Sequence, residues 1–206
     1  MKIQKKCPND YEHEYWAQGL SVVGIDEAGR GPLAGELVVA GVQFEIGYEN
    51  PDIYDSKALS EKKREELFHQ IQEDALYFEI IEVSIDDIDR YNIYRADQIA
   101  MHRIAESLPG EIILTDAMPL DLNKKVIPLV KGDQKSISIA AGSILAKVTR
   151  DHLMAKYDEL YPQYGFKKNK GYPTKEHLQA IEEFGITPIH RRSFGPVKAK
   201  QQQLDL

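Results

Sequence analysis

Residues 21–44 have the sequence SVVGIDEAGRGPLAGELVVAGVQF, and this stretch decides the fold. Its two ends, residues 21–25 and 37–44, are short runs of apolar and β-branched side chains, a pattern typical of buried strands. The glycines and the proline between them favour a turn, because both residue types interrupt strands. The stretch therefore predicts two strands, with the acidic pair Asp26-Glu27 directly after the first.

The rest of the chain alternates helical and strand patterns. Helices are predicted over residues 61–74, most of 85–108, 136–161 and 174–184, and strands over 77–84, 111–115 and 126–130. Pro128 favours an edge position for the last strand, because proline cannot donate a ladder hydrogen bond. The order predicts an α/β domain with a mixed five-stranded sheet flanked by helices, residues 1–160. A helical C-terminal extension, residues 161–206, is predicted to complete the same structural unit.

The composition is that of a globular protein. The chain has 206 residues, 42% of them hydrophobic and 29% charged, which is enough to bury a core without cross-links. A single cysteine, Cys7, excludes a disulfide framework and a multi-cysteine zinc site. The N-terminus lacks the apolar segment of a signal peptide, and the longest apolar stretches are too short to span a bilayer. We therefore expect a cytoplasmic monomer that does not bind membranes.

The charge is divided unevenly along the chain. The formal net charge is −7, which argues against a nucleic-acid partner because phosphate binding needs positive charge. However, residues 1–146 carry a net −11, whereas residues 147–206 carry a net +4. The acidic total therefore does not exclude such a partner, because the basic region can hold a phosphate backbone.

Four acidic residues lie at or just past predicted strand ends. Asp26 and Glu27 follow the first strand, Asp116 follows the fourth, and Asp133 lies just past the fifth. Sites in open α/β sheets form at the carboxyl ends of strands, so these acids converge if strands one and four are neighbours. Close carboxylates repel one another, and a divalent cation removes this repulsion. Oxygen ligands without a Cys or His cluster favour Mg²⁺ or Mn²⁺ over zinc, and we expect two such ions. Taken singly, each acid is better explained as a solvated turn residue.

The segment Gly29-Arg30-Gly31 follows the acidic pair. Glycines let the backbone approach a ligand closely, so that its N–H and C=O groups can contact a small polar feature such as a ribose hydroxyl. The alternative is a simple turn with Arg30 in solvent. The glycine spacing does not match the dinucleotide-binding fingerprint.

Seven segments, found in order over about residues 22–197, make the chain resemble the ribonuclease HII family, the bacterial type 2 ribonucleases H. They are GIDEAGRGP (24–32), DSK (55–57), the strand-end Asp116, KGD (131–133), SILAKVTRD (143–151), GYPT (171–174) and HRRSF (190–194). Small departures are Gly142, where alanine is expected, and Ala117-Met118, where Gly-Asn is frequent. Neither removes an acid.

The resemblance implies a ribonuclease-H-like fold and an endonuclease that cuts RNA within RNA–DNA hybrids. It also implies cutting on the 5′ side of single ribonucleotides in duplex DNA, leaving 3′-OH and 5′-phosphate ends. The family's metal-binding catalytic acids fall on Asp26, Glu27, Asp116 and Asp133. Its element that contacts the ribose 2′-OH falls on Gly29, Arg30 and Gly31, and its sugar-packing tyrosine falls on Tyr172. Lys57, Ser143 and Lys147 are candidate phosphate contacts, and Arg150 shares a helical face with the last two.

Two other function classes stay open. One is a non-catalytic nucleic-acid-binding module that uses the basic C-terminal region. The other is a different ribonuclease-H-like nuclease, such as an exonuclease or a resolvase, although such exonucleases typically separate their first two acids by one residue.

Two C-terminal features have alternative interpretations. His190, beside Arg191-Arg192, either touches a phosphate or belongs to a structural turn. The last residues, Gln203-Leu204-Asp205-Leu206, resemble the short motif with which bacterial replication proteins bind the sliding clamp, and otherwise form a polar terminus.

Overall fold

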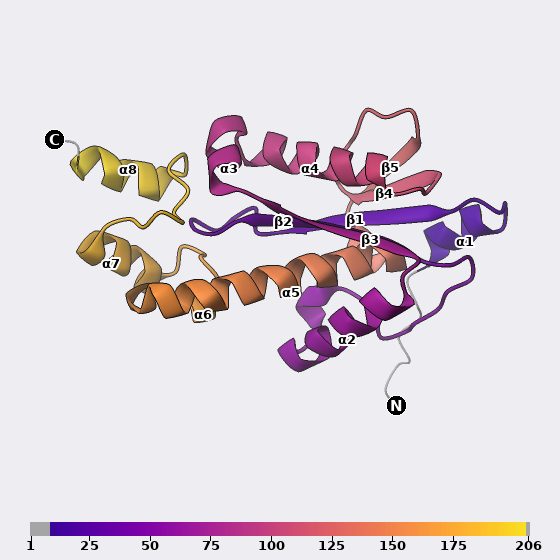
Figure 1. Cartoon of the computed structure of the whole chain (residues 1–206), viewed down its shortest axis with the longest axis horizontal. Helices are drawn as coiled ribbons and strands as arrows, with labels where there is room; N and C mark the ends of the chain where they lie inside the picture. The colour runs from indigo at the N-terminus through magenta and orange to yellow at the C-terminus, as the bar shows by residue number, and fades with distance from the viewer. Residues whose placement is uncertain (1–8, 205–206) are drawn as a thin grey trace.

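The computed structural model describes residues 9–204, the last two by their backbone. Five strands form one mixed sheet in the order β3-β2-β1-β4-β5 (Figure 1). They are β1 (Val22–Ala28), β2 (Leu37–Gln43), β3 (Tyr77–Val83), β4 (Ile112–Asp116) and β5 (Lys125–Leu129). Strand β2 pairs antiparallel with β1 and β3, whereas β4 pairs parallel with β1 and β5. The predicted mixed α/β sheet is confirmed, and Pro128 lies in an edge strand as expected.

Eight α-helices surround the sheet within the described residues. They are α1 (Asp10–Trp16), α2 (Glu61–Asp74), α3 (Ile85–Tyr91), α4 (Ile93–Ser107), α5 (Ile137–Leu160), α6 (Phe166–Asn169), α7 (Lys175–Phe184) and α8 (Gly195–Leu204). Three 3-10 helices, Ser56–Ala58, Gly132–Gln134 and Pro162–Tyr164, join them. Within residues 9–204, no helix combines the length and the apolarity needed to cross a membrane.

The helix predicted over residues 85–108 is two helices. Asn92 adopts a positive φ of 65°, which ends α3, and its side chain accepts a hydrogen bond from the Arg95 N–H to cap α4. Asparagine tolerates this conformation better than most residues. The break sets the direction of α4, which carries a residue of the candidate site described below.

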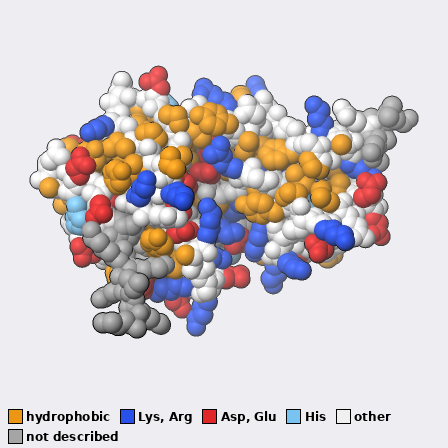
Figure 2. Space-filling view, turned by 180° about the vertical axis from the view of Figure 1, so that it is seen from behind, with side chains coloured by type: hydrophobic (Ala, Val, Ile, Leu, Met, Phe, Trp, Pro, Cys, Tyr) orange, Lys and Arg blue, Asp and Glu red, His pale blue; other side chains and the backbone are white. Residues whose placement is uncertain are grey.

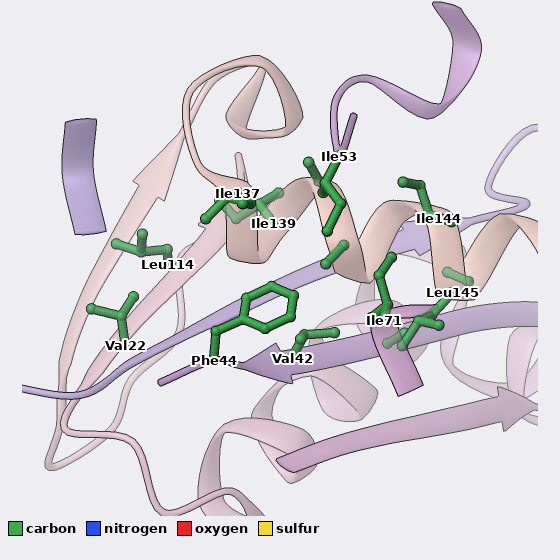
Figure 3. Packing of buried hydrophobic residues seen from close by; sticks show 14 of the residues in the cluster. Val22, Val42, Phe44, Ile53, Ile71, Leu114, Ile137, Ile139, Ile144 and Leu145 are labelled. Atoms are coloured by element: carbon green, nitrogen blue, oxygen red, sulfur yellow. The ribbon is translucent and has the colours of Figure 1, made fainter. Parts of the chain in front are cut away.

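Each face of the sheet has its own hydrophobic core, with α4 covering one face and α5 the other (Figure 1). Successive β1 side chains point to opposite faces, so Val22 packs on the α5 side and Val23 on the α4 side. Figure 3 shows part of the α5 core, where Val42 and Leu114 from the sheet join Ile139 from the helix. Strand β1 is therefore buried on both sides and fixes the position of the acids at its end.

Small residues let α5 lie directly on the sheet. A Cβ on Gly24 of β1 would lie 2.2 Å from the Ile139 nitrogen. A Cβ on Gly142 would lie 2.7 Å from the Ala40 oxygen and 3.3 Å from the Asp26 nitrogen. In this chain the glycine at position 142 therefore permits a contact that alanine would crowd, and α5 lies close to the end of β1.

The C-terminal extension packs on α5 and on the loop between β1 and β2. A third hydrophobic cluster joins Leu33 of this loop and Met154 of α5 with Phe166 and Ile189 of the extension. The Arg191 N–H donates to the Leu33 carbonyl at 2.8 Å. The boundary at residue 160 stays a prediction, because these contacts join the two parts.

Candidate active site

A cleft of about 420 Å³ opens at the carboxyl ends of β1 and β4. These strands are parallel neighbours, with Ile25 opposite Thr115, so Asp26 and Asp116 lie at the same end of the sheet. The prediction that Asp26 and Glu27 follow the strand is wrong, because β1 continues through both acids to Ala28 by pairing with β2. The cleft is lined by Asp26, Glu27, Ala28, Gly29, Arg30, Gly31, Ser56, Lys57, Asp116, Ser143, Lys147, Arg150 and Tyr172. The lining includes ten of the eleven site residues expected from the sequence, and Asp133 is the exception.

Three carboxyl groups are close enough in the cleft to affect one another. Burial, and then repulsion from Glu27 and Asp116, raises the pKa of Asp26 well above its ordinary value. Asp26 Oδ1 accepts the Glu27 N–H at 2.8 Å. Burial also raises the pKa of Glu27, although the nearby Arg30 charge opposes this rise. The cleft thus concentrates carboxyl groups, and the Arg30 charge compensates them only in part.

Asp133 lies next to this group without lining the cleft. It is buried in the 3-10 helix Gly132–Gln134, and Asp116 Oδ1 accepts the Gly132 N–H at 2.8 Å. Burial, followed by repulsion from Asp55 and Asp116, raises the pKa of Asp133. The fourth expected acid is therefore connected to the cleft through Asp116.

The donor set suits a divalent cation that binds together with other ligands. All of the acids offer carboxylate oxygens, and Glu27 Oε2 is buried without a hydrogen-bond partner among the described residues. In this arrangement, no three acidic, His or Cys side chains of residues 9–204 form a complete metal site. Mg²⁺ fits such a partial site, because it keeps several waters and uses one or two carboxylates together with substrate phosphate oxygens.

The Gly-Arg-Gly turn faces Tyr172 within the cleft. Gly29 has φ of 104°, and a Cβ there would lie 2.1 Å from Arg150 Nε, so only glycine fits. A Cβ on Gly31 would lie 3.4 Å from the Tyr172 ring. Tyr172 is 45% exposed and lines the cleft beside the turn, so its ring is available to a ligand that enters the cleft.

The three residues predicted to contact phosphates differ in solvent exposure and in their hydrogen-bond partners. Lys57 is exposed, whereas Ser143 is buried and pairs with the Ser56 hydroxyl at 3.0 Å. Lys147 is half-buried and donates to Asp151 at 2.7 Å. Lys57 is therefore the more accessible of the two lysines.

Two buried arginines hold the loop after the Gly-Arg-Gly turn. Arg150 donates to the carbonyls of Ala34, Glu36 and Lys170. Arg191 donates to the carbonyls of Arg30, Pro32, Gly35 and Glu36 at 2.8–3.3 Å. All three nitrogens of each guanidinium group donate to backbone oxygens, so these two residues support the loop, even though Arg150 shares a helical face with Lys147.

His190 belongs to a buried hydrogen-bond chain. Its Nδ1 accepts the Thr187 N–H at 2.9 Å, so its proton lies on Nε2 and faces His177 Nε2 at 3.1 Å. His177 Nδ1 in turn donates to the Tyr172 carbonyl at 2.9 Å. Of the two interpretations of His190, the structural one is correct, and the chain ends on the backbone of the residue whose ring lines the cleft.

Asp97 was not expected from the sequence. It is fully buried on α4, and burial, followed by the Glu27 charge, raises its pKa to about 8. Its Oδ2 lies 3.5 Å from Arg30 Nε, and Arg30 Nη1 lies 3.6 Å from Glu27 Oε1. In the sequence, Asp97 stands out as an acid on the apolar helix face that contains Ile93 and Ile104. The sequence does not show which cationic side chain it contacts.

Two relatives with similar sequences are both named ribonuclease HII. Ribonuclease HII from Leuconostoc mesenteroides is 50% identical over 192 residues, which cover 92% of this chain and 76% of that protein. Ribonuclease HII from Desulfitobacterium hafniense is 50% identical over 201 residues, 95% of this chain and 75% of the relative. The structure also matches that of ribonuclease H2 from Pyrococcus horikoshii with a TM-score of 0.74 and 25% identity, covering 90% of this chain and 99% of that one.

A second solved structure is the complex of PCNA and ribonuclease HII from Archaeoglobus fulgidus. It matches with a TM-score of 0.74 and 28% identity, over 85% of this chain and 96% of that one. The family model of ribonuclease HII matches residues 23–197, which contain the whole cleft. The chain therefore belongs to the ribonuclease HII family and is a hydrolase of the ribonuclease H type.

Proposed function

We propose that the protein is an endonuclease that cuts the RNA strand of RNA–DNA hybrids and also cuts 5′ to single ribonucleotides in duplex DNA. The products are 3′-OH and 5′-phosphate ends, and two Mg²⁺ or Mn²⁺ ions act in the reaction. The observation that carries this proposal is one cleft in which clustered carboxyl groups lie beside a glycine turn that faces an exposed tyrosine.

The turn and Tyr172 would select the ribonucleotide. The 2′-OH distinguishes RNA from DNA, and a backbone without side chains at Gly29 and Gly31 can come within hydrogen-bond distance of it. The Tyr172 ring would pack on the neighbouring sugar and reject a misplaced one. Arg150 and Arg191 keep this turn in place by binding the carbonyls that follow it.

The acids would hold the cations at the scissile phosphate. Asp26 and Asp116 come from neighbouring strand ends, and Glu27 and Asp133 would complete the ligand sets. Divalent ions bound there supply an activated water and charge stabilisation at the leaving oxygen. Burial, and then repulsion from Glu27 and Asp116, raises the pKa of Asp26, and a bound cation would oppose this rise.

The basic side chains would hold the nucleic-acid backbone. Residues 147–206 carry a net +4, and Lys57 and Lys147 line the cleft. Figure 2 shows Lys and Arg side chains gathered across the middle of one face, beside acidic side chains. Because the whole chain carries −7, binding without metal should be weak and sensitive to salt.

The decisive experiment uses an end-labelled DNA duplex that contains one ribonucleotide, incubated with Mg²⁺ or Mn²⁺. We expect a single cut on its 5′ side, no cut in the matching all-DNA duplex, and loss of cleavage by orders of magnitude in Asp116→Asn. Tyr172→Ala should impair cleavage while leaving the fold intact. An intact duplex with both metals would remove the proposal.

The same assay separates the alternatives. A non-catalytic module would bind the hybrid without metal-dependent cutting, and an exonuclease would produce a ladder from the labelled end. Four acids near phosphates would only weaken a pure binder, which favours the nuclease.

The C-terminus is a candidate for sliding-clamp binding. The solved complex of PCNA with the Archaeoglobus fulgidus enzyme supports this proposal. Here Gln203 and Leu204 end helix α8, and Asp205 and Leu206 lie outside the described residues. Deleting residues 203–206 should abolish binding to the bacterial clamp, whereas binding that is unchanged or absent from the start would contradict it.

A further inference from the structure

The buried carboxyl group of Asp97 needs an explanation that the core of the protein does not supply. Neither of its oxygens has a hydrogen-bond partner among the described residues, and the side chain is fully buried. An uncompensated buried carboxyl group costs several kcal/mol, so packing alone would favour an apolar residue at this position. Its nearest charged partner is Arg30 of the Gly-Arg-Gly turn, with Nε 3.5 Å from Asp97 Oδ2.

Arg30 lies between two acids. Its Nη1 is 3.6 Å from Glu27 Oε1, a distance similar to that from Nε to Asp97, and both exceed an ordinary hydrogen bond. Tyr94, three residues before Asp97 on α4, contributes its ring at 5.9 Å from the guanidinium carbon. One turn of α4 therefore attracts the Arg30 side chain from one side, and Glu27 attracts it from the other.

We propose that Asp97 is a positioning residue that shares the Arg30 guanidinium with Glu27, so that neither pair closes to a direct hydrogen bond and Glu27 stays available to a cation. This inference rests on the proposed function, in which Glu27 is a metal ligand. Without Asp97, the guanidinium would close on Glu27 to form a direct charge-assisted pair, because these two are the acids that pair with Arg30 within residues 9–204. Arg30 would then compete with the cation for the same carboxylate.

If Arg30 competes with the cation for Glu27, the variant Asp97→Asn should need more metal for cleavage. The asparagine has nearly the same shape but loses the charge, so the metal concentration for half-maximal cleavage should rise about tenfold at pH 8.5, above the pKa of about 8 to which burial raises Asp97. Cleavage at saturating Mn²⁺ should stay within twofold of wild type, since added metal overcomes a competitor. Glu106→Gln removes an exposed charge from the same helix and should change neither quantity.

Two further measurements distinguish this role from a merely structural one. Calorimetric titration with Mn²⁺ alone should show the same tenfold weakening, and this result does not require nuclease activity. In an Arg30→Gln background, Asp97→Asn should have no further effect on metal affinity, because the competitor is gone.

Several outcomes would overturn the proposal. Unchanged metal affinity in Asp97→Asn would do so, as would an equal loss of activity at every metal concentration or the same weakening in the Arg30→Gln background. If the single variant fails to fold, the titration of Arg30→Gln alone decides, because metal affinity lower than wild type would contradict competition by Arg30. The two proposals can fail separately. If Asp97→Asn weakens Mn²⁺ binding but the wild-type protein cuts no hybrid, this inference stands and the proposed function is rejected.

Discussion

Acidification should destabilise the protein through His190. Burial, and then the adjacent His177, lowers the pKa of His190 from its ordinary 6.5 to about 4. Protonation would place a hydrogen on Nδ1, where the Thr187 N–H already donates. The folded state therefore binds this proton less tightly than the unfolded state does.

The sign and the size follow from proton linkage. Between pH 6.5 and about 4 the unfolded chain binds more protons at His190, so the free energy of unfolding falls as the pH falls through this window. The complete effect is about 3 kcal/mol, at roughly 1.4 kcal/mol for each pKa unit. Between pH 7 and pH 5 the loss from this residue should be about 2 kcal/mol.

The assay is urea unfolding at several pH values. Unfolding is monitored by the fluorescence of the single tryptophan, Trp16, which is buried in the folded protein. Buried acids such as Asp26 have raised pKa values and oppose the trend, so the comparison must be with His190→Asn. The asparagine oxygen can still accept the Thr187 N–H but does not titrate. Wild type should lose about 2 kcal/mol more than this variant from pH 7 to pH 5.

The partly exposed His102 provides the matched control. His102→Asn should follow the wild-type pH dependence within about 0.5 kcal/mol. A constant stability difference between wild type and His190→Asn across this pH range would refute the assignment of a neutral, buried His190.

Three other predictions concern stability. Arg191→Met should lower the free energy of unfolding by about 3 kcal/mol, because the carbonyls of Arg30, Pro32 and Gly35 lose this donor and Glu36 keeps only its bond from Arg150. Arg192 is exposed, so Arg192→Met should change the free energy by less than about 0.5 kcal/mol, and similar losses for both variants in urea unfolding would contradict this. Gly24→Ala should cost more than about 2 kcal/mol because its Cβ meets the α5 backbone, while Gly195→Ala, with open space around it, should be nearly neutral by the same measurement. Asp26→Asn should stabilise the metal-free protein by about 1 kcal/mol by removing carboxylate repulsion, and it should also reduce the thermal shift that Mn²⁺ produces; a destabilised variant with an undiminished shift would argue against the acid cluster.

The sheet and most of the cleft could be predicted from the sequence because their signals are local. The strand runs on either side of the Gly-Arg-Gly turn have clear composition, and acids directly after strands meet when the strands are parallel neighbours. Helix α2, with its Ser60 cap, has the predicted bounds for the same reason.

The parts that escaped prediction depend on distant partners. Asp97 looks like any acid on a helix until the fold brings it to Arg30, and the role of Arg191 becomes visible only when the loop carbonyls are in place. Asn92 breaks a helical pattern through a backbone conformation that the residue tolerates but does not dictate. The sequence therefore predicts buried polar residues poorly, because their roles depend on partners that only the fold brings near.

The bond between Arg191 and the loop has a consequence for how the protein is made. The donor and the Gly35 carbonyl are 156 positions apart, so this loop can acquire its final support only after nearly the whole chain has left the ribosome. Contacts of such sequence separation form late, because the entropy of closing the intervening chain must be overcome first. The sheet and its acids can assemble earlier from residues 22–129 and α5. The nascent protein would therefore carry its clustered carboxyl groups before the selective turn is fixed beside them, and full discrimination between RNA and DNA would be the last property to appear.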